Sequence, residues 1–209
     1  MADRYQQLID SPPGRFVSKQ FGLPRPEHLR RYEPGQPLME GPALLGGDGA
    51  LLGPVRETLE AAREEAHDKF SEDLTYGALV FDASGIRRTE ELRRLYDFFH
   101  PAIRSVRPSG RVLVLGRPPD SLDDPRAHTA QWALEGFTRS VGKELRRGAT
   151  IQLVYVEDGA EAGMESTLRF LLSSKSAYVD GQVVRIGPRI GGLSDPQGRV
   201  PSDADQHQA

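Results

Sequence analysis

Short apolar segments alternate with amphipathic helices through the middle of this chain, and this alternation most limits the fold it can adopt. Residues 131–145 carry an apolar stripe at helical spacing from Leu134 to Leu145. The apolar segment Ile151–Val156 follows almost directly and has the length of a strand. A helix that runs into a short apolar strand is half of an α/β repeat.

The same pattern recurs along residues 43–188. We expect five strands, at Ala43–Leu45, Ala78–Phe81, Arg111–Leu115, Ile151–Val156 and Val179–Ile186. We expect helices between them at 54–66, 89–106, 125–147 and 164–172. Right-handed crossovers would make a three-layer, doubly wound, mostly parallel sheet of the Rossmann or flavodoxin-like kind.

The two ends of the chain have a different composition from its middle. Residues 1–42 are rich in proline but keep regularly placed apolar residues, which predicts an N-terminal extension of short turns and extended pieces. Residues 43–188 form the expected Rossmann-like domain. Residues 189–209 carry Pro, Gly, Asp and Ser with little apolar spacing, which is typical of a linker. We expect this tail to lead toward a second domain.

Composition excludes several classes of function. The chain has 209 residues, a net charge of −3 and no cysteine, so thiolate catalysis and Cys-ligated metals are excluded and no basic field favours nucleic acid. No His, Asp or Glu spacing indicates a metal site. No segment has membrane-spanning length, and we expect a soluble, cytoplasmic protein.

A glycine-rich loop between the first strand and the first helix is the arrangement that cradles phosphates in nucleotide-binding folds. Its glycines, Gly46, Gly47, Gly49 and Gly53, are weak candidates for cofactor binding. The spacing does not match a dinucleotide fingerprint, since Val55 stands where the last glycine would be. A tight turn without nucleotide is the favoured interpretation.

Five stretches together resemble the short-chain dehydrogenases/reductases, and in particular the 3-oxoacyl-(acyl-carrier-protein) reductases. They are Ala78–Ile86, Gly110–Leu115, Ala133–Leu145, Phe170–Ser174 and Ala177–Gln182. The third stretch is similar to the helix that follows the family's catalytic Tyr-x-x-x-Lys. The resemblance implies a Rossmann fold, with a tyrosine that protonates the substrate carbonyl and a lysine that binds the nicotinamide ribose.

The positions that match the family's catalytic residues are occupied by other side chains. The lysine position is Gln131, the tyrosine position is Ala127, and the serine position is Arg117, or Gly116 if the register slips by one. Neither Ala127 nor Gln131 can donate or activate a proton in the family's manner. The resemblance therefore implies a domain that has lost the catalytic site.

A narrower resemblance includes the N-terminal run from Leu23 to Pro37, Leu-Pro-x-Pro-x-x-Leu-Arg-Arg-Tyr-x-x-Gly-x-Pro. It is similar to the first domain of the high-molecular-weight 3-oxoacyl-(acyl-carrier-protein) reductases. In that family a degenerate, flavodoxin-like Rossmann domain precedes a complete NADH-dependent reductase domain, and the proteins are dimers. The resemblance implies a non-catalytic domain without a cofactor, in a parent that reduces 3-oxoacyl thioesters with NADH or NADPH in fatty acid biosynthesis.

The same resemblance implies a homodimer through the helices at 89–106 and 125–147. On the second helix, Trp132, Phe137 and Val141 are the interface candidates, with intramolecular packing as the alternative for Phe137. Arg30, Arg31, Arg146 and Arg147 could attract an acyl carrier protein or a coenzyme A phosphate, although such pairs are more often solvated.

Two other functions remain open from the residues alone. One is an oxidoreductase of the same family with a rewired active site that uses Tyr155 or His128 as the proton donor. The other is a flavodoxin-like FMN carrier, which the loop disfavours because it lacks Ser and Thr and places Asp48 where a phosphate would lie.

Overall fold

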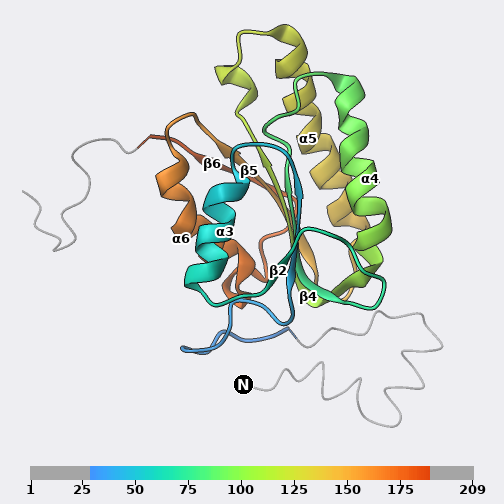
Figure 1. The fold of residues 1–209 in the computed structure, drawn as a ribbon, viewed down its shortest axis with the longest axis vertical. Helices are drawn as coiled ribbons and strands as arrows, with labels where there is room; N and C mark the ends of the chain where they lie inside the picture. Colours follow the sequence, from blue (N-terminus) through green and yellow to red (C-terminus); the bar gives the residue numbers. More distant parts are fainter. Residues whose placement is uncertain (1–28, 189–209) are drawn as a thin grey trace, which may run out of the picture.

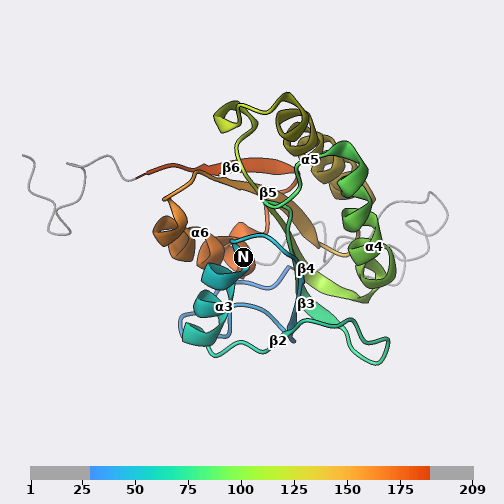
Figure 2. The ribbon, with the colours of Figure 1, turned by 45° about the horizontal axis from the view of Figure 1, so that its top comes forward.

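A computed structural model describes residues 29–188 as a three-layer α/β fold. A central sheet has helices on both faces (Figures 1 and 2). Six strands pair in the order β2-β1-β3-β4-β5-β6, and every pairing is parallel. The predicted doubly wound fold is confirmed.

The sheet has one strand more than the sequence pattern predicted. Its strands are β1 (Ala43–Gly47), β2 (Ala66–His67), β3 (Tyr76–Asp82), β4 (Val106–Gly116), β5 (Thr150–Val156) and β6 (Gln182–Ile186). The additional strand β2 has only two residues, so it carries no periodicity that a sequence could show. β6 begins at Gln182 instead of Val179, because Gly181 adopts a φ of +63° just before it.

Within residues 29–188, four helices cover the sheet, namely α3 (Leu52–Ala61), α4 (Arg93–Ala102), α5 (Pro125–Glu144) and α6 (Met164–Leu172). Three of them, α3, α4 and α5, are shorter than predicted. The helix expected at 89–106 is divided into a 3-10 turn at Thr89–Leu92, α4, and a 3-10 turn at Ile103–Ser105. α5 ends at Glu144, and Arg147 beyond it has a φ of +57°, which a helix does not allow.

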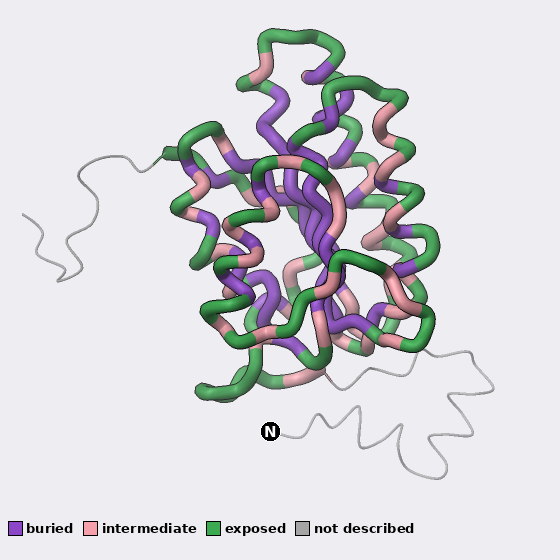
Figure 3. Tube along the Cα trace, viewed as in Figure 1, coloured by how far each residue is buried: buried purple, intermediate pink, exposed green. Residues whose placement is uncertain are grey.

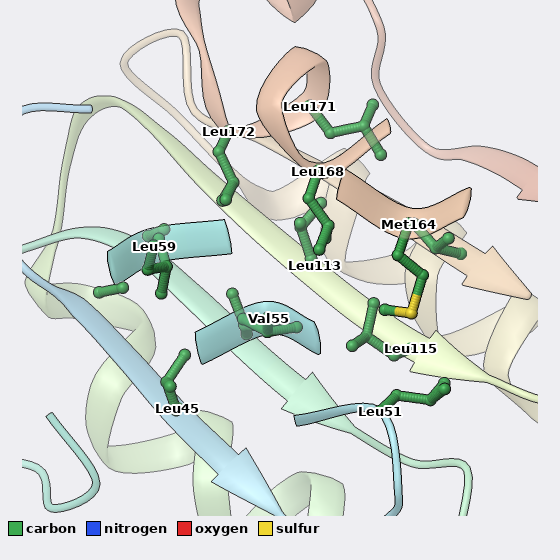
Figure 4. Close-up of a cluster of buried hydrophobic side chains, with 14 of the residues drawn as sticks. Leu45, Leu51, Val55, Leu59, Leu113, Leu115, Met164, Leu168, Leu171 and Leu172 are labelled. Atoms are coloured by element: carbon green, nitrogen blue, oxygen red, sulfur yellow. The ribbon is translucent and has the colours of Figure 1, made fainter. Parts of the chain in front are cut away.

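Two apolar clusters hold the layers together, one on each face of the sheet. Helices α3 and α6 pack on one face, where Figure 4 shows Val55, Leu59 and Leu168 directed toward Leu113 and Leu115 of β4. Helices α4 and α5 pack on the other face. Figure 3 shows the central strands buried along their length, as expected for a parallel sheet covered on both sides.

The chain crosses from one side of the sheet to the other between β1 and β3. β1 leads through α3 to β2 on one side, and the next strand, β3, pairs with β1 on its other side. In open α/β sheets, ligands bind at the carboxyl ends of the strands at such a switch point. Here that edge is formed by Gly47, Asp82, Gly116 and Val156, which end β1, β3, β4 and β5.

Residues 29–42, which lead into β1, form no helix or strand. Within residues 29–42, Met39 is buried and Leu38 packs against the cluster on the α3 and α6 face. Residues 1–28 and 189–209 lie outside the described part, so the proposed extension and linker remain predictions. None of the helices between residues 29 and 188 has the length and apolar character needed to span a bilayer.

The packing of α6 on the sheet predicts the effect of shortening one side chain. Leu168→Ala removes a fully buried side chain from the cluster around Leu113 and Leu115, and should lower the free energy of unfolding by about 2–5 kcal/mol. Urea unfolding at one fixed protein concentration measures this loss. Ser166→Ala, on the exposed side of the same helix, is the control and should change stability by less than about 0.5 kcal/mol. Equal losses in the two variants would contradict this packing.

Candidate functional site

The loop after β1 reaches the position where a Rossmann fold holds a nucleotide phosphate. Gly47 has a φ of +93°, which allows the tight turn out of β1. At Gly49 a Cβ atom would collide with the side chains of Asp82 and Ser84, so this position allows a close approach between two loops. Gly46 lies against the ring of Phe98, and Gly53 lies inside α3. The glycines of this loop thus allow a close contact, and at Gly49 the contacted residues are Asp82 and Ser84 of the same chain.

The carboxylate of Asp82 fills the anion position at the N-terminus of α3. Asp82 is completely buried at the end of β3. Its Oδ2 accepts hydrogen bonds from the backbone N–H groups of Leu51 at 2.7 Å and Leu52 at 3.1 Å, and its Oδ1 accepts one from the N–H of Ser84 at 2.9 Å. The first N–H groups of a helix carry positive partial charge and commonly bind anions. A phosphate placed here would meet a buried negative charge in place of free donors.

Asp48, which the sequence placed where a phosphate would lie, is not the residue at this position. Its side chain is exposed and forms an ion pair with Arg94, at the start of α4. The pair joins the β1 loop to the helix on the other face. The inhibitory carboxylate expected from Asp48 is therefore supplied by Asp82, whose position at the end of an apolar strand was the only signal in the sequence.

Gln131 occupies the family's lysine position and joins three segments of the carboxyl edge. Its side chain is buried on α5. The amide Nε2 donates to the carbonyl oxygens of Ala83 and Ile86, both at 2.8 Å, and Oε1 accepts from the N–H of Arg117 at 2.9 Å. Gly116 makes room for it, since a Cβ there would press on Oε1. The amide is fully used within the protein.

Arg117, at the family's serine position, turns away from the centre of the edge. Its Nη1 donates to the carbonyl oxygen of Val156 at 3.0 Å, and its Nη2 lies 2.9 Å from Glu161 Oε1 and 3.1 Å from Asp158 Oδ1. The pKa of Glu161 lies below its ordinary value, because a backbone N–H and the Arg117 guanidinium both hydrogen-bond to its carboxylate. Arg117 thus fastens the end of β4 to the loop after β5.

The tyrosine position, Ala127, and the two candidate proton donors, Tyr155 and His128, are held by packing or by hydrogen bonds within the protein. Ala127, at the tyrosine position, is fully buried. The buried Tyr155 hydroxyl donates to the main-chain oxygen of Gln131 at 2.7 Å, and burial raises the pKa of Tyr155, with a smaller contribution from Glu135. His128 Nδ1 lies 3.0 Å from the carbonyl oxygen of Pro119. Because a carbonyl only accepts, this nitrogen carries the proton and the ring is oriented by the backbone.

Of the three positions that the resemblance singles out, Arg117 and Gln131 are joined by a hydrogen bond, and the buried Ala127 lies one helical turn before Gln131 on α5. A nicotinamide dinucleotide does not fit the residues present, since Asp82 takes the phosphate position and Gln131 replaces the ribose-binding lysine. Among residues 29–188, no group of three or more His, Asp or Glu side chains could hold a metal ion.

Two of the three interface candidates on α5, Phe137 and Val141, line a groove between α4 and α5. The groove has a volume of about 970 Å³ and is mainly apolar. Phe137 and Val141 line it together with Leu92, Leu95, Tyr96, Phe99, Ile103 and Leu145. Phe137 also packs on Phe99, with ring centroids 5.3 Å apart, so intramolecular packing is part of its role. Trp132 lies outside this lining; its side chain is 56% exposed, and its ring is 5.4 Å from that of His128.

Comparison with known proteins shows the fold. No protein-family model matches the chain, and no curated protein matches it in sequence. A short-chain dehydrogenase/reductase from Serratia marcescens BCRC 10948 aligns with a TM-score of 0.57 and 13% identity, over 72% of this chain and 98% of that one. Another short-chain dehydrogenase/reductase, described as a glucose/ribitol dehydrogenase from Brucella melitensis, aligns with a TM-score of 0.56 and 13% identity, over 71% of this chain and 96% of that one.

BdcA, solved in complex with NADPH, aligns with a TM-score of 0.52 and 16% identity, over 71% of this chain and 94% of that one. At these identities the likeness concerns the fold, and the chain has the α/β Rossmann-like fold of short-chain dehydrogenases/reductases. The NADPH belongs to BdcA.

The hydrogen bonds of Gln131 predict that removing its side-chain amide lowers the stability of the protein. Gln131→Leu keeps a side chain of similar size but leaves the carbonyl oxygen of Ile86 and the N–H of Arg117 without a hydrogen-bond partner, whereas the carbonyl oxygen of Ala83 still accepts from the N–H of Ile86. Each such buried group costs about 1–3 kcal/mol, so a loss of about 2 kcal/mol or more in the free energy of unfolding is expected. Thr129→Ala, at an exposed position on the same helix, is the control for urea unfolding. A Gln131→Leu variant as stable as this control would show that the amide does not hold the edge.

Proposed function

We propose that this chain is a non-catalytic structural and dimerisation domain of a two-domain 3-oxoacyl-(acyl-carrier-protein) or acyl-CoA reductase. Its parent would reduce a 3-oxoacyl thioester with NADH or NADPH on a separate domain. The observation that carries the proposal is the closure of the carboxyl edge by the amide of Gln131. Gln131 and Arg117, which are joined in this closure, align with catalytic positions of the family. This is expected when a reductase domain keeps its fold after its catalytic residues have been replaced.

The Asp82 carboxylate supports the absence of a cofactor in this domain. A dinucleotide pyrophosphate carries negative charge and relies on free N–H groups at the helix N-terminus. In this chain Leu51 and Leu52 already donate to Asp82. Binding of a nucleotide would require the carboxylate to leave a completely buried position and lose three hydrogen bonds, which disfavours both NAD(P)H and FMN.

The alternative, a reductase with a rewired site, is less favoured by the same contacts. Tyr155 would have to give up its hydrogen bond to Gln131 and lose a proton from a buried hydroxyl whose pKa is raised. His128 keeps only Nε2 available, because Nδ1 is held by Pro119.

The apolar groove supports the dimerisation part of the proposal. Exposed apolar grooves on folded proteins are candidate contact sites for another protein or for a ligand. Tyr96, although 58% exposed, lines the groove with Val141 and Leu145. A second copy that packs its own α4 and α5 against the same surface would bury both grooves in one isologous contact.

The basic residues near this surface are a weaker part of the proposal. Arg146 and Arg147 lie at the end of the groove, and the Nη2 of Arg147 already donates to the carbonyl oxygen of Val106 at 2.7 Å. Arg30 lies near the start of β4 and contacts Gln36 and Pro37. A role in attracting an acyl carrier protein or a coenzyme A thioester therefore falls to exposed residues such as Arg146.

Turnover by the isolated chain tests the non-catalytic role. With acetoacetyl-CoA as the substrate and NADH or NADPH as the reductant, we expect no oxidation of the cofactor above the rate without protein. Absorbance at the nicotinamide wavelength measures this rate. A rate that disappears in Tyr155→Phe or His128→Ala would contradict the proposal and support the rewired active site.

Substitution in the groove tests dimerisation. Val141→Glu places a charge in the apolar groove and should convert a dimer to a monomer in size-exclusion chromatography with light scattering, with an unchanged circular dichroism spectrum. Tyr178→Glu is the control, because Tyr178 is 91% exposed and lies outside the groove. A monomeric wild-type chain, or a Val141→Glu variant that stays dimeric, would contradict the proposed interface.

A further inference from the structure

A small polar cavity lies at the opposite end of the sheet from the closed carboxyl edge. It has a volume of about 130 Å³ and lies between the start of β4, the segment before β1 and the turn after α6. Its lining includes Arg30, Glu40, Arg107, Arg111 and Ser173. Three guanidinium groups and one carboxylate thus surround a space that holds only a few water-sized molecules.

Arg111 is a buried cation that has only neutral hydrogen-bond partners. Its residue is 2% exposed. Nε lies 3.2 Å from the carbonyl oxygen of Ser173 and 3.1 Å from Ser176 Oγ, and Nη1 donates to the carbonyl oxygens of Ser109 at 2.9 Å and Gly110 at 3.2 Å. Within residues 29–188 it has no ion pair, and its Nη2 makes no hydrogen bond. A buried charge without an opposite charge is costly, which favours an anion beside it.

Arg30 and Arg107 add positive charge that one exposed carboxylate compensates only in part. Arg107 Nη2 lies 3.8 Å from Glu40 Oε2, and Arg30 Nε lies 3.9 Å from Glu40 Oε1. The Glu40 side chain is 60% exposed. The Nε of Arg107 is buried and has no hydrogen-bond partner among the described residues. A donor in this state costs free energy unless a ligand accepts from it.

An irregularity in the sheet shapes this cavity. Tyr76 of β3 pairs with Val106 of β4, and the next pair joins Ala78 to Arg111. Residues 107–110 of β4 therefore lie opposite the single residue Gly77, and Ser109 within them has a φ of +56°. Bulges of this kind redirect side chains and occur often beside functional sites. Here the bulge carries Arg107 and brings the carbonyl oxygens that hold Arg111.

We propose that this cavity binds a small oxyanion of the phosphate type through Arg107 and Arg111. A tetrahedral phosphate presents several acceptor oxygens, which match the unused Nη2 of Arg111 and the unpaired Nε of Arg107. Guanidinium groups bind such oxygens through short, charge-assisted hydrogen bonds. Lys175, which lies over the ring of Tyr32 at 4.1 Å, adds positive charge to the same end of the sheet. The anion would be free phosphate or the terminal phosphate of a larger molecule.

Calorimetric titration of the full chain with inorganic phosphate at constant ionic strength tests the site. We expect saturable binding with one site per chain, and at least tenfold weaker binding for Arg107→Gln, which removes a half-buried donor. Arg111→Gln should abolish binding, but it also removes hydrogen bonds from a buried position and so disturbs folding, which makes Arg107→Gln the decisive variant. Arg93→Gln, which removes an equal charge from an exposed side chain on α4, should bind phosphate like the wild-type chain.

The other outcomes contradict the proposal. Absence of saturable binding, or equal binding by the wild-type chain and Arg107→Gln, would mean that only a non-specific charge effect exists. If the wild-type chain binds phosphate, comparison with adenosine 3′,5′-bisphosphate distinguishes the free ion from a terminal phosphate, since the larger molecule binds only if the cavity accepts a phosphate ester.

Discussion

The side-chain amide of Gln131 is the contact on which the rest of the carboxyl edge depends. One donor group and one acceptor on α5 fix the loop after β3 and the end of β4 at the same time. The main-chain oxygen of the same residue accepts from Tyr155 on β5. Three neighbouring strands are thereby tied to one helix at the point where a reductase of this fold would hold its substrate. The side-chain amide of Gln131 makes three hydrogen bonds within the protein, which is the basis for proposing a structural role for this residue.

Asp82 has the corresponding role on the other side of the switch point. Its carboxylate neutralises the N-terminus of α3 from within the sheet, so the turn after β1 needs no ligand to be stable. Together, the side chains of Asp82 and Gln131 hydrogen-bond to backbone groups along the carboxyl edge of the sheet. The features that remain unsatisfied in the described residues are elsewhere: the apolar groove between α4 and α5, and the arginine cavity at the amino ends of the strands.

Much of the fold could be predicted because it follows from periodicity. The five longer strands and α6 were predicted from apolar runs and helical spacing. The assignment of Gln131 and Ala127 to the family's catalytic positions stays a prediction. β2 was missed because a two-residue strand depends on its pairing with β1 alone. Asp82 and Arg111 were missed as site residues because their roles depend on partners 30 to 65 positions away. Periodicity describes what a segment buries, whereas a closed site depends on contacts between segments.

The central claim is that the protein's own side chains occupy the nucleotide-binding edge. A ¹H–¹⁵N correlation spectrum of the chain, recorded with and without millimolar NADPH, tests this most directly. The backbone N–H resonances of Leu51, Leu52, Ser84 and Arg117 report on the bonds to Asp82 and Gln131. We predict that none of these resonances moves when NADPH is added. Saturable shifts of these resonances would show that the edge opens to a nucleotide and would contradict the account.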